Sequence, residues 1–178
     1  MALNPQIIGK DMPHGFAGCY ARQPDMIVNT RPCGGTSPIT FGTPVMYDSN
    51  HNVVPMAGAG TAASKFLGVA AAEIKSSLSY LAPGAGQFAP GEPVGVFQRG
   101  SINVKCYKGS PALGGTVYVR IVETGAYAET TVVGGFEAEA DSTTAANVVA
   151  LPADICQWGG PADANGVAEL VILTRPMA

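Results

Sequence analysis

An all-β fold is predicted for this chain, as a small barrel or jelly-roll-like β domain with an extended N-terminal arm. Glycine and proline supply 23 and 14 of the 178 residues, which is too turn-rich for a helix bundle. Short apolar and β-branched runs recur roughly every 10–15 residues with turn residues between them, and no segment keeps a long helical period. Strands this short and this evenly spaced are typical of a barrel or a sandwich.

Residues 1–38 are predicted to form the arm, because prolines and glycines throughout this range interrupt any helix. The arm is nevertheless rich in apolar side chains, which need cover from a partner or from the protein's own body. We expect a partner surface to bind the arm through Ile7, Ile8, Met12, Phe16, Arg22 and Arg31. The alternative, in which the arm folds back on the body, stays open at this point.

Residues 39–178 are predicted to form the β-rich body. Its clearest strands are 101–106 and 116–121, where apolar and polar residues alternate as on a strand with one buried face. We expect these two strands to share one sheet, and we expect 94–98 to turn at 99–100 into the first of them. Further strands are predicted at 39–46, 53–54, 65–74, 126–133 and 166–173.

An acidic loop region is predicted around residues 134–166. Residues 122–178 carry eight acidic side chains and one arginine, whereas residues 1–121 carry nine basic and five acidic side chains. Two ends of opposite charge suit a protein with one docked side and one solvent-facing side. Chance loop composition would give the same pattern.

Low charge is the strongest compositional signal of function. Charged residues make up 13% of the chain, about half of the roughly 25% usual in a soluble domain. Because the centres of interfaces are depleted in charge, this composition favours a surface that other proteins cover. A small, weakly charged β domain without such a partner is the alternative.

No catalytic, cofactor-binding or metal site is predicted, so we expect a protein that is not an enzyme. Residues 58–63 and 84–89 fit a loose dinucleotide-loop pattern, but neither lies in a strand–helix unit. His14 and His51 are the only histidines, and neither has the orienting third group that a catalytic base needs. The four cysteines form no Cys-x-x-Cys pair and are expected to be free thiols.

Nucleic acids and membranes are not expected partners. Lys10, Arg22 and Arg31 are offset in the arm by Asp11 and Asp25, so the arm lacks the basic footprint of a nucleic-acid binder. No segment reaches the ~18 apolar residues of a membrane span. The first ten residues lack the order of a signal peptide, so synthesis in the cytoplasm is expected.

Seven short segments, taken in their order along the chain, resemble those of a known protein family. The segments are GFAGCYARQP at 15–24, ITFGTPV at 39–45, KFLGV at 65–69, PGEPV at 90–94, RGSINV at 99–104, GGTVYV at 114–119 and DANGVAEL at 163–170. In order and spacing the chain resembles the structural cement proteins of tailed bacteriophages, which decorate the capsid.

The resemblance implies a protein on the outer surface of the virion, made in the host cytoplasm. Its partners would be the major capsid protein, whose neighbouring capsomers it would bridge, and further copies of itself in a homotrimer or homodimer. It implies no activity and no cofactor. The cysteines and the acidic stretch at 134–147 depart from the family pattern.

Two alternatives to a cement protein remain. One is another β-rich virion accessory, such as a tail or head-fibre component. The other is a carbohydrate-binding β domain, which would usually contain more aromatic residues than the 7% found here.

Overall fold

The computed structural model describes residues 13–72, 86–123 and 131–174, and it confirms the all-β fold. Two 3-10 helices, η1 (Ala63–Lys65) and η2 (Ala145–Asn147), are the only helical turns in these ranges. The strands are β1 (Tyr20–Pro32), β2 (Ile39–Thr40), β3 (Pro44–Tyr47), β4 (Val53–Pro55), β5 (Gly68–Ala70), β6 (Gln87–Phe88), β7 (Pro93–Lys108), β8 (Tyr118–Arg120), β9 (Phe136–Glu137), β10 (Val148–Ala150), β11 (Cys156–Trp158) and β12 (Val167–Ile172).

Ten strands join in one sheet, whose main path runs β10-β8-β9-β7-β5-β3-β4. Off this path, β1 and β12 pair with β7, and β11 pairs with β12, while β2 and β6 form a separate two-stranded sheet. Within the described residues, β10 and β4 end the path and do not pair with each other. The expected barrel is therefore corrected to an open, branched sheet. The sheet branches because β7 exchanges its neighbours along its length instead of keeping one pair.

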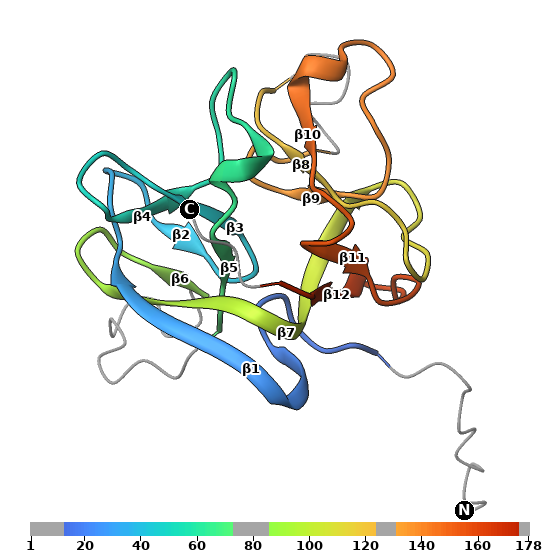
Figure 1. Ribbon diagram of the computed structural model, residues 1–178, viewed down its shortest axis with the longest axis horizontal. Helices are drawn as coiled ribbons and strands as arrows, with labels where there is room; N and C mark the ends of the chain where they lie inside the picture. The colour runs from blue at the N-terminus through green and yellow to red at the C-terminus, as the bar shows by residue number, and fades with distance from the viewer. Residues whose placement is uncertain (1–12, 73–85, 124–130, 175–178) are drawn as a thin grey trace, which may run out of the picture.

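Strand β7 is the centre of the fold and runs from one side of the molecule to the other (Figure 1). It pairs antiparallel with β1, β5 and β12, and parallel with β9. The turn predicted at 99–100 is wrong, because Gly100 lies inside the strand with a φ of +104°. A Cβ at this position would lie 2.7 Å from the carbonyl oxygen of Asp25. Glycine therefore lets β7 bend against β1 without breaking.

Much of the range predicted as an extended arm pairs with the body. Tyr20–Pro32 form β1, whose register on β7 runs from Tyr20 opposite Ile102 to Pro32 opposite Pro93. Tyr20 also stacks on Phe97 with ring centroids 5.5 Å apart. Pairing satisfies the backbone donors and acceptors that an isolated extended segment would leave to solvent. Residues 1–12 lie outside the described part of the chain.

Side chains of β5 and β7 alternate between two hydrophobic cores. Val69 of β5 packs into the larger core and Ala70 into the smaller one. Val96 of β7 belongs to the smaller core, whereas the adjacent Phe97 belongs to the larger. Trp158 lies in the larger core, where its ring meets Phe136 edge-on at a centroid distance of 6.4 Å.

Most of the predicted strands are confirmed. Val117, Val119 and Ile121 are buried around β8, and β8 and β7 share a sheet with β9 between them. The range 65–74 contains strand β5, the range 166–173 contains β12, and residues 124–130 lie outside the described part. The range 134–166, expected to be an acidic loop, holds β9, β10, β11 and η2. Glu137 and Asp141 are buried there, because they pair with an arginine of β8.

Candidate docking surface

Three of the six predicted partner-binding residues, Phe16, Arg22 and Arg31, lie in the described part of the chain. Ile7, Ile8 and Met12 lie outside the described residues. Phe16 leaves 81% of its surface exposed. Arg22 and Arg31 lie near opposite ends of β1, opposite Ser101 and Val94 of β7. These two partners span about 23 Å of β7 at roughly 3.3 Å per residue.

Both arginines already have partners within the chain. Arg22 makes a bidentate ion pair with Glu169 of β12, with its Nε 2.8 Å from one carboxylate oxygen and its terminal nitrogen 3.1 Å from the other. Arg31 donates through Nε to the hydroxyl of Tyr47 at 3.0 Å. The Arg22 side chain stays 72% exposed, so a second contact can form on its outer face.

Phe16 is displayed on a fixed segment. The Gly18 N–H donates to the carbonyl of Asn103 at 2.7 Å, and the Asn103 N–H donates to the carbonyl of Cys19 at 2.8 Å. Earlier in the segment, the His14 N–H donates to the carboxylate of Asp163 at 2.9 Å. These bonds hold the backbone on both sides of Phe16 while its ring projects into solvent. An exposed aromatic ring on an ordered backbone is suited to protein contact.

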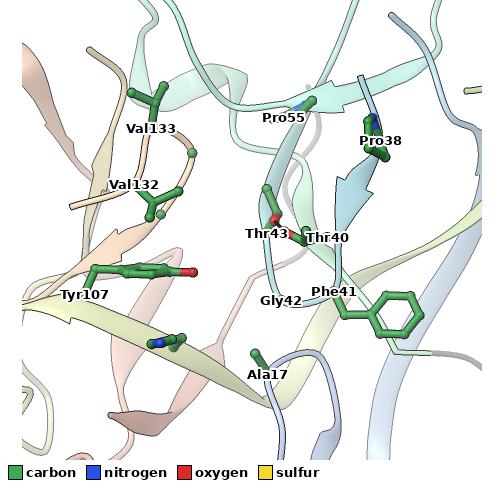
Figure 2. Close-up of a pocket in the computed structure, with 13 residues that line it drawn as sticks. Ala17, Pro38, Thr40, Phe41, Gly42, Thr43, Pro55, Tyr107, Val132 and Val133 are labelled. Carbon is green, nitrogen blue, oxygen red and sulfur yellow. Dashed lines mark hydrogen bonds between the residues drawn. The ribbon is translucent and has the colours of Figure 1, made fainter. Parts of the chain in front are cut away.

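A pocket of about 130 Å³ opens where the first and last thirds of the chain meet on β7, and we call it the seam pocket. Its walls come from five separate segments. They are Ala17, the segment 38–43 before β3, Pro55 of β4, the residues Lys105 and Tyr107 of β7, and the turn at 132–135. Figure 2 shows the Tyr107 phenol directed from β7 toward the turn that carries Thr40 and Thr43.

The polar side chains of the seam pocket are one lysine and three hydroxyl residues, all of which can donate hydrogen bonds. Lys105 is exposed, and its ammonium lies 5.3 Å from the centre of the Tyr107 ring, in the range of a cation–π contact. Burial raises the pKa of the Tyr107 phenol, so its hydroxyl keeps its proton. Across the pocket, the hydroxyls of Thr40 and Thr43 lie 2.8 Å apart and share one hydrogen bond.

The rim of the seam pocket is apolar. Val132 and Val133 leave 46% and 38% of their surfaces exposed, and they are two of the five large apolar side chains exposed in the described residues. Pro38 and Pro55 lie on the opposite rim. The Phe41 ring points away from the pocket (Figure 2) and packs edge-on against Phe88 at 5.0 Å.

The turn at 132–135 is fixed by the backbone of Arg120. The Gly134 N–H donates to the carbonyl of Arg120 at 2.7 Å, and the Arg120 N–H donates to the carbonyl of Gly135 at 3.0 Å. A Cβ on Gly135 would lie 2.7 Å from the Tyr107 ring, so glycine lets the turn pack directly on that ring. The wall of the pocket therefore depends on the position of Arg120.

Arg120 is in turn held by two buried carboxylates. Its guanidinium makes two parallel hydrogen bonds to Glu137 and a third to Asp141 at 2.9 Å, and all three side chains are 0% exposed. The hydrogen bonds that Arg120 donates to Glu137 raise the pKa of Arg120. Hydrogen bonds from Thr143 and Arg120 hold the pKa of Asp141 well below its ordinary value. This triad is structural, because solvent does not reach it.

The described residues contain no arrangement typical of an active site. No group of three or more His, Cys, Asp or Glu side chains among them could hold a metal ion. The His14 ring contacts the carbonyl of Pro161, and His51 lies in an exposed turn with a positive φ. No helix in the described part of the chain is long and apolar enough to cross a membrane.

Two features of this surface were not predicted from the sequence. The seam pocket depends on contacts among distant segments, and only the adjacent valines at 132–133 before two glycines gave a local signal. The buried triad had no local signal. The alternation at 116–121 puts Arg120 on the face opposite to Val119 and Ile121, so only the contacts with Glu137 and Asp141 reveal that it is buried.

The fold and the family were compared with known proteins. A chain in the structure described as the capsid of Myoviridae phage XM1 has a TM-score of 0.63 and 17% sequence identity, over 99% of this chain and 100% of that chain. It shows the same fold. The family model described as "Structural cement protein (E217 gp24/Pam3 gp6)" matches residues 4–173.

The chain belongs to the structural cement protein family. The family resemblance seen in the sequence is thereby confirmed, and the chain has a structural role in the phage capsid. A comparison with curated proteins gives no match.

Proposed function

We propose that this cement protein binds the outer surface of the shell formed by the major capsid protein and stabilises the shell by bridging neighbouring capsomers. The observation that carries this proposal is the family match over residues 4–173. It binds as a homotrimer or homodimer, after synthesis in the host cytoplasm. A protein that contacts several shell subunits gains avidity from contacts that are individually weak.

The contact residues in this proposal are those of the N-terminal segment together with the seam pocket. Phe16 supports the assignment because its exposed ring is presented on a hydrogen-bonded backbone. Complete burial of a phenylalanine side chain contributes about 1.5–3 kcal/mol. Ile7, Ile8 and Met12 add apolar groups before it, and Arg22 and Arg31 offer positive charge beyond it.

A shell-binding assay tests the proposal. The purified protein is mixed with expanded shells that lack it, and bound protein is measured by sedimentation and located by electron microscopy. We expect saturable binding on the outside of the head. No binding to such shells, or labelling on the tail instead, would contradict the proposal.

A matched pair of variants tests the contact residues. Phe16 and Leu113 leave 81% and 82% of their surfaces exposed, so Phe16→Ala and Leu113→Ala both remove an exposed apolar side chain at little cost to the fold. We expect Phe16→Ala to weaken shell binding and Leu113→Ala to leave it unchanged. Deletion of residues 2–12 should also weaken binding while the melting temperature of the free protein stays the same.

A further inference from the structure

The side chains that line the seam pocket include one ammonium and three hydroxyls, and no acid. Lys105 is the only ionisable group in its lining that is charged at neutral pH, and the described residues give it no ion pair. The centre of the Tyr107 ring lies 5.3 Å from its ammonium, and the pair formed by Thr40 and Thr43 leaves one hydroxyl hydrogen unused. An ammonium and hydroxyl hydrogens around one small space that contains no carboxylate are suited to an anionic group.

We propose that the seam pocket binds a carboxylate side chain carried by an extended segment of the major capsid protein. The carboxylate accepts hydrogen bonds from Lys105 and Tyr107, and an apolar side chain next to it in the segment packs on Val132 and Val133. This inference rests on the proposed function, because it assumes that the shell is the partner.

The size of the pocket restricts what enters it. Its volume of about 130 Å³ is well below the roughly 300–1,000 Å³ of small-molecule sites. One side chain therefore fits, whereas a helix or a folded ligand does not. The apolar rim then contacts the residues on either side of that side chain.

The walls of the pocket are fixed before any partner arrives. The backbone bonds between Arg120 and the turn at 132–135 hold one wall. On the other wall, Gly42 has a φ of +78°, and a Cβ there would lie 2.7 Å from the Cβ of Ala17. Close packing of this kind leaves little freedom to lose on binding, so the contact forms at a low entropic cost.

The acids of this chain favour the shell protein over a second copy as the source of the carboxylate. Among the ten acidic residues that the structure describes, only Glu123 and Asp154 lack a side-chain partner. The other eight are engaged in ion pairs or hydrogen bonds, namely Asp25, Asp48, Glu92, Glu137, Glu139, Asp141, Asp163 and Glu169. Most acids of a second copy would therefore have to share or give up an existing contact in order to enter the pocket.

Charge reversal at matched positions tests the inference. Lys105→Glu places an acid in the pocket, whereas Lys65→Glu makes the same charge change at an exposed lysine outside it. Binding to shells that lack the protein is measured for both, with Lys105→Arg as the conservative variant. We expect Lys105→Glu to weaken binding about tenfold or more, and Lys65→Glu and Lys105→Arg to stay within about twofold of the parent.

The outcomes separate this inference from the proposed function. If the parent protein does not bind shells, the proposed function fails. If the parent binds and Lys105→Glu binds equally well, the inference is overturned while the proposed function stands. Equal losses for Lys105→Glu and Lys65→Glu would also overturn it, because they would show a general charge effect.

A zero-length cross-link tests the identity of the occupant without any variant. Carbodiimide activates a carboxylate, and the deprotonated amine of a lysine in contact with it then forms an amide while the carbodiimide leaves as a urea. We expect mass spectrometry of treated, decorated shells to show Lys105 linked to an aspartate or glutamate of the major capsid protein. A link from Lys105 to a second copy or to this chain's own acids overturns the inference, as does the absence of any Lys105 link.

Discussion

Arg120 of β8 and Glu137 of β9 form a bidentate ion pair in which neither side chain is exposed to solvent. The pair lies where the two strands run antiparallel, and Asp141 binds the remaining guanidinium nitrogen. Together the three side chains carry one net negative charge. Such a group is tolerated in the interior because nearly every donor and acceptor in it is matched by hydrogen bonds.

Replacing Arg120 with methionine should strongly destabilise the protein, because two carboxylates would be left buried without their counter-ion. Loss of one partner of a buried pair costs about 3–5 kcal/mol, measurable as the free energy of unfolding in urea. Arg99→Met is the control, since Arg99 pairs with Asp25 at the surface at 3.3 Å and such pairs contribute at most ~1 kcal/mol. Similar losses for the two variants would show that the triad is not structurally important.

Stability should fall as the pH drops below about 4, the ordinary pKa of an aspartate. The pKa of Asp141 is lower in the folded protein than in the unfolded chain, so the folded state binds fewer protons. The stability that Asp141 contributes is therefore fully present above its pKa in the unfolded chain. That stability is lost as the pH falls toward its pKa in the folded protein. Backbone donors lower the pKa of Asp48 and Asp163 in the same direction.

Urea unfolding between pH 7 and pH 2.5 measures this decline. Asp141→Asn should be less stable than the parent at pH 7 and should show a shallower loss on acidification. Two curves that fall in parallel would rule out Asp141 as a source of the acid sensitivity.

Gly100→Ala should destabilise the protein more than Gly60→Ala. Both glycines have a positive φ, of +104° and +80°, which costs an L-residue roughly 1–2 kcal/mol. Only at Gly100 would the added methyl group also meet a backbone oxygen, that of Asp25, at 2.7 Å. Thermal melting of the two variants measures the difference, and equal melting temperatures would show that β1 can move away from β7 freely.

Cys156 should resist alkylation in the native protein. Its side chain is fully buried in the larger core, and burial raises the pKa of its thiol to about 12, so almost no thiolate is present at pH 8. Iodoacetamide labelling followed by mass spectrometry should modify the half-buried Cys19 before Cys156. Rapid native-state labelling of Cys156 would mean that the larger core opens easily.

Local patterns were enough to predict most of the strands. The alternation at 101–106 and 116–121 depends only on neighbouring residues and on one buried face, and both segments lie in the sheet. Gly100 shows the limit of local patterns. A glycine with a positive φ can end a strand in a turn or bend it at a bulge, and only the partner strand β1 determines which occurs.

Contacts between distant residues explain what the sequence did not predict. The prolines of the N-terminal segment suit an edge-like strand as well as a free arm, and the pairing of β1 with β7 joins residues about seventy positions apart, such as Val28 and Phe97. The seam pocket required five separate segments to be placed at once. The capsid role could be predicted from the family resemblance, because the resemblance depends on the order of many segments and not on any local site.

The alternation of β7 between two cores has a consequence for cooperativity. Val96 and Phe97 are consecutive residues, yet they pack into different cores. Neither core can therefore unfold without displacing a stretch of β7 that the other core also needs. A chain built in this way should lose both cores in a single all-or-none transition. The fluorescence of Trp158, the only tryptophan, reports on the larger core, and its unfolding curve should coincide with that of far-ultraviolet circular dichroism, which reports on every strand.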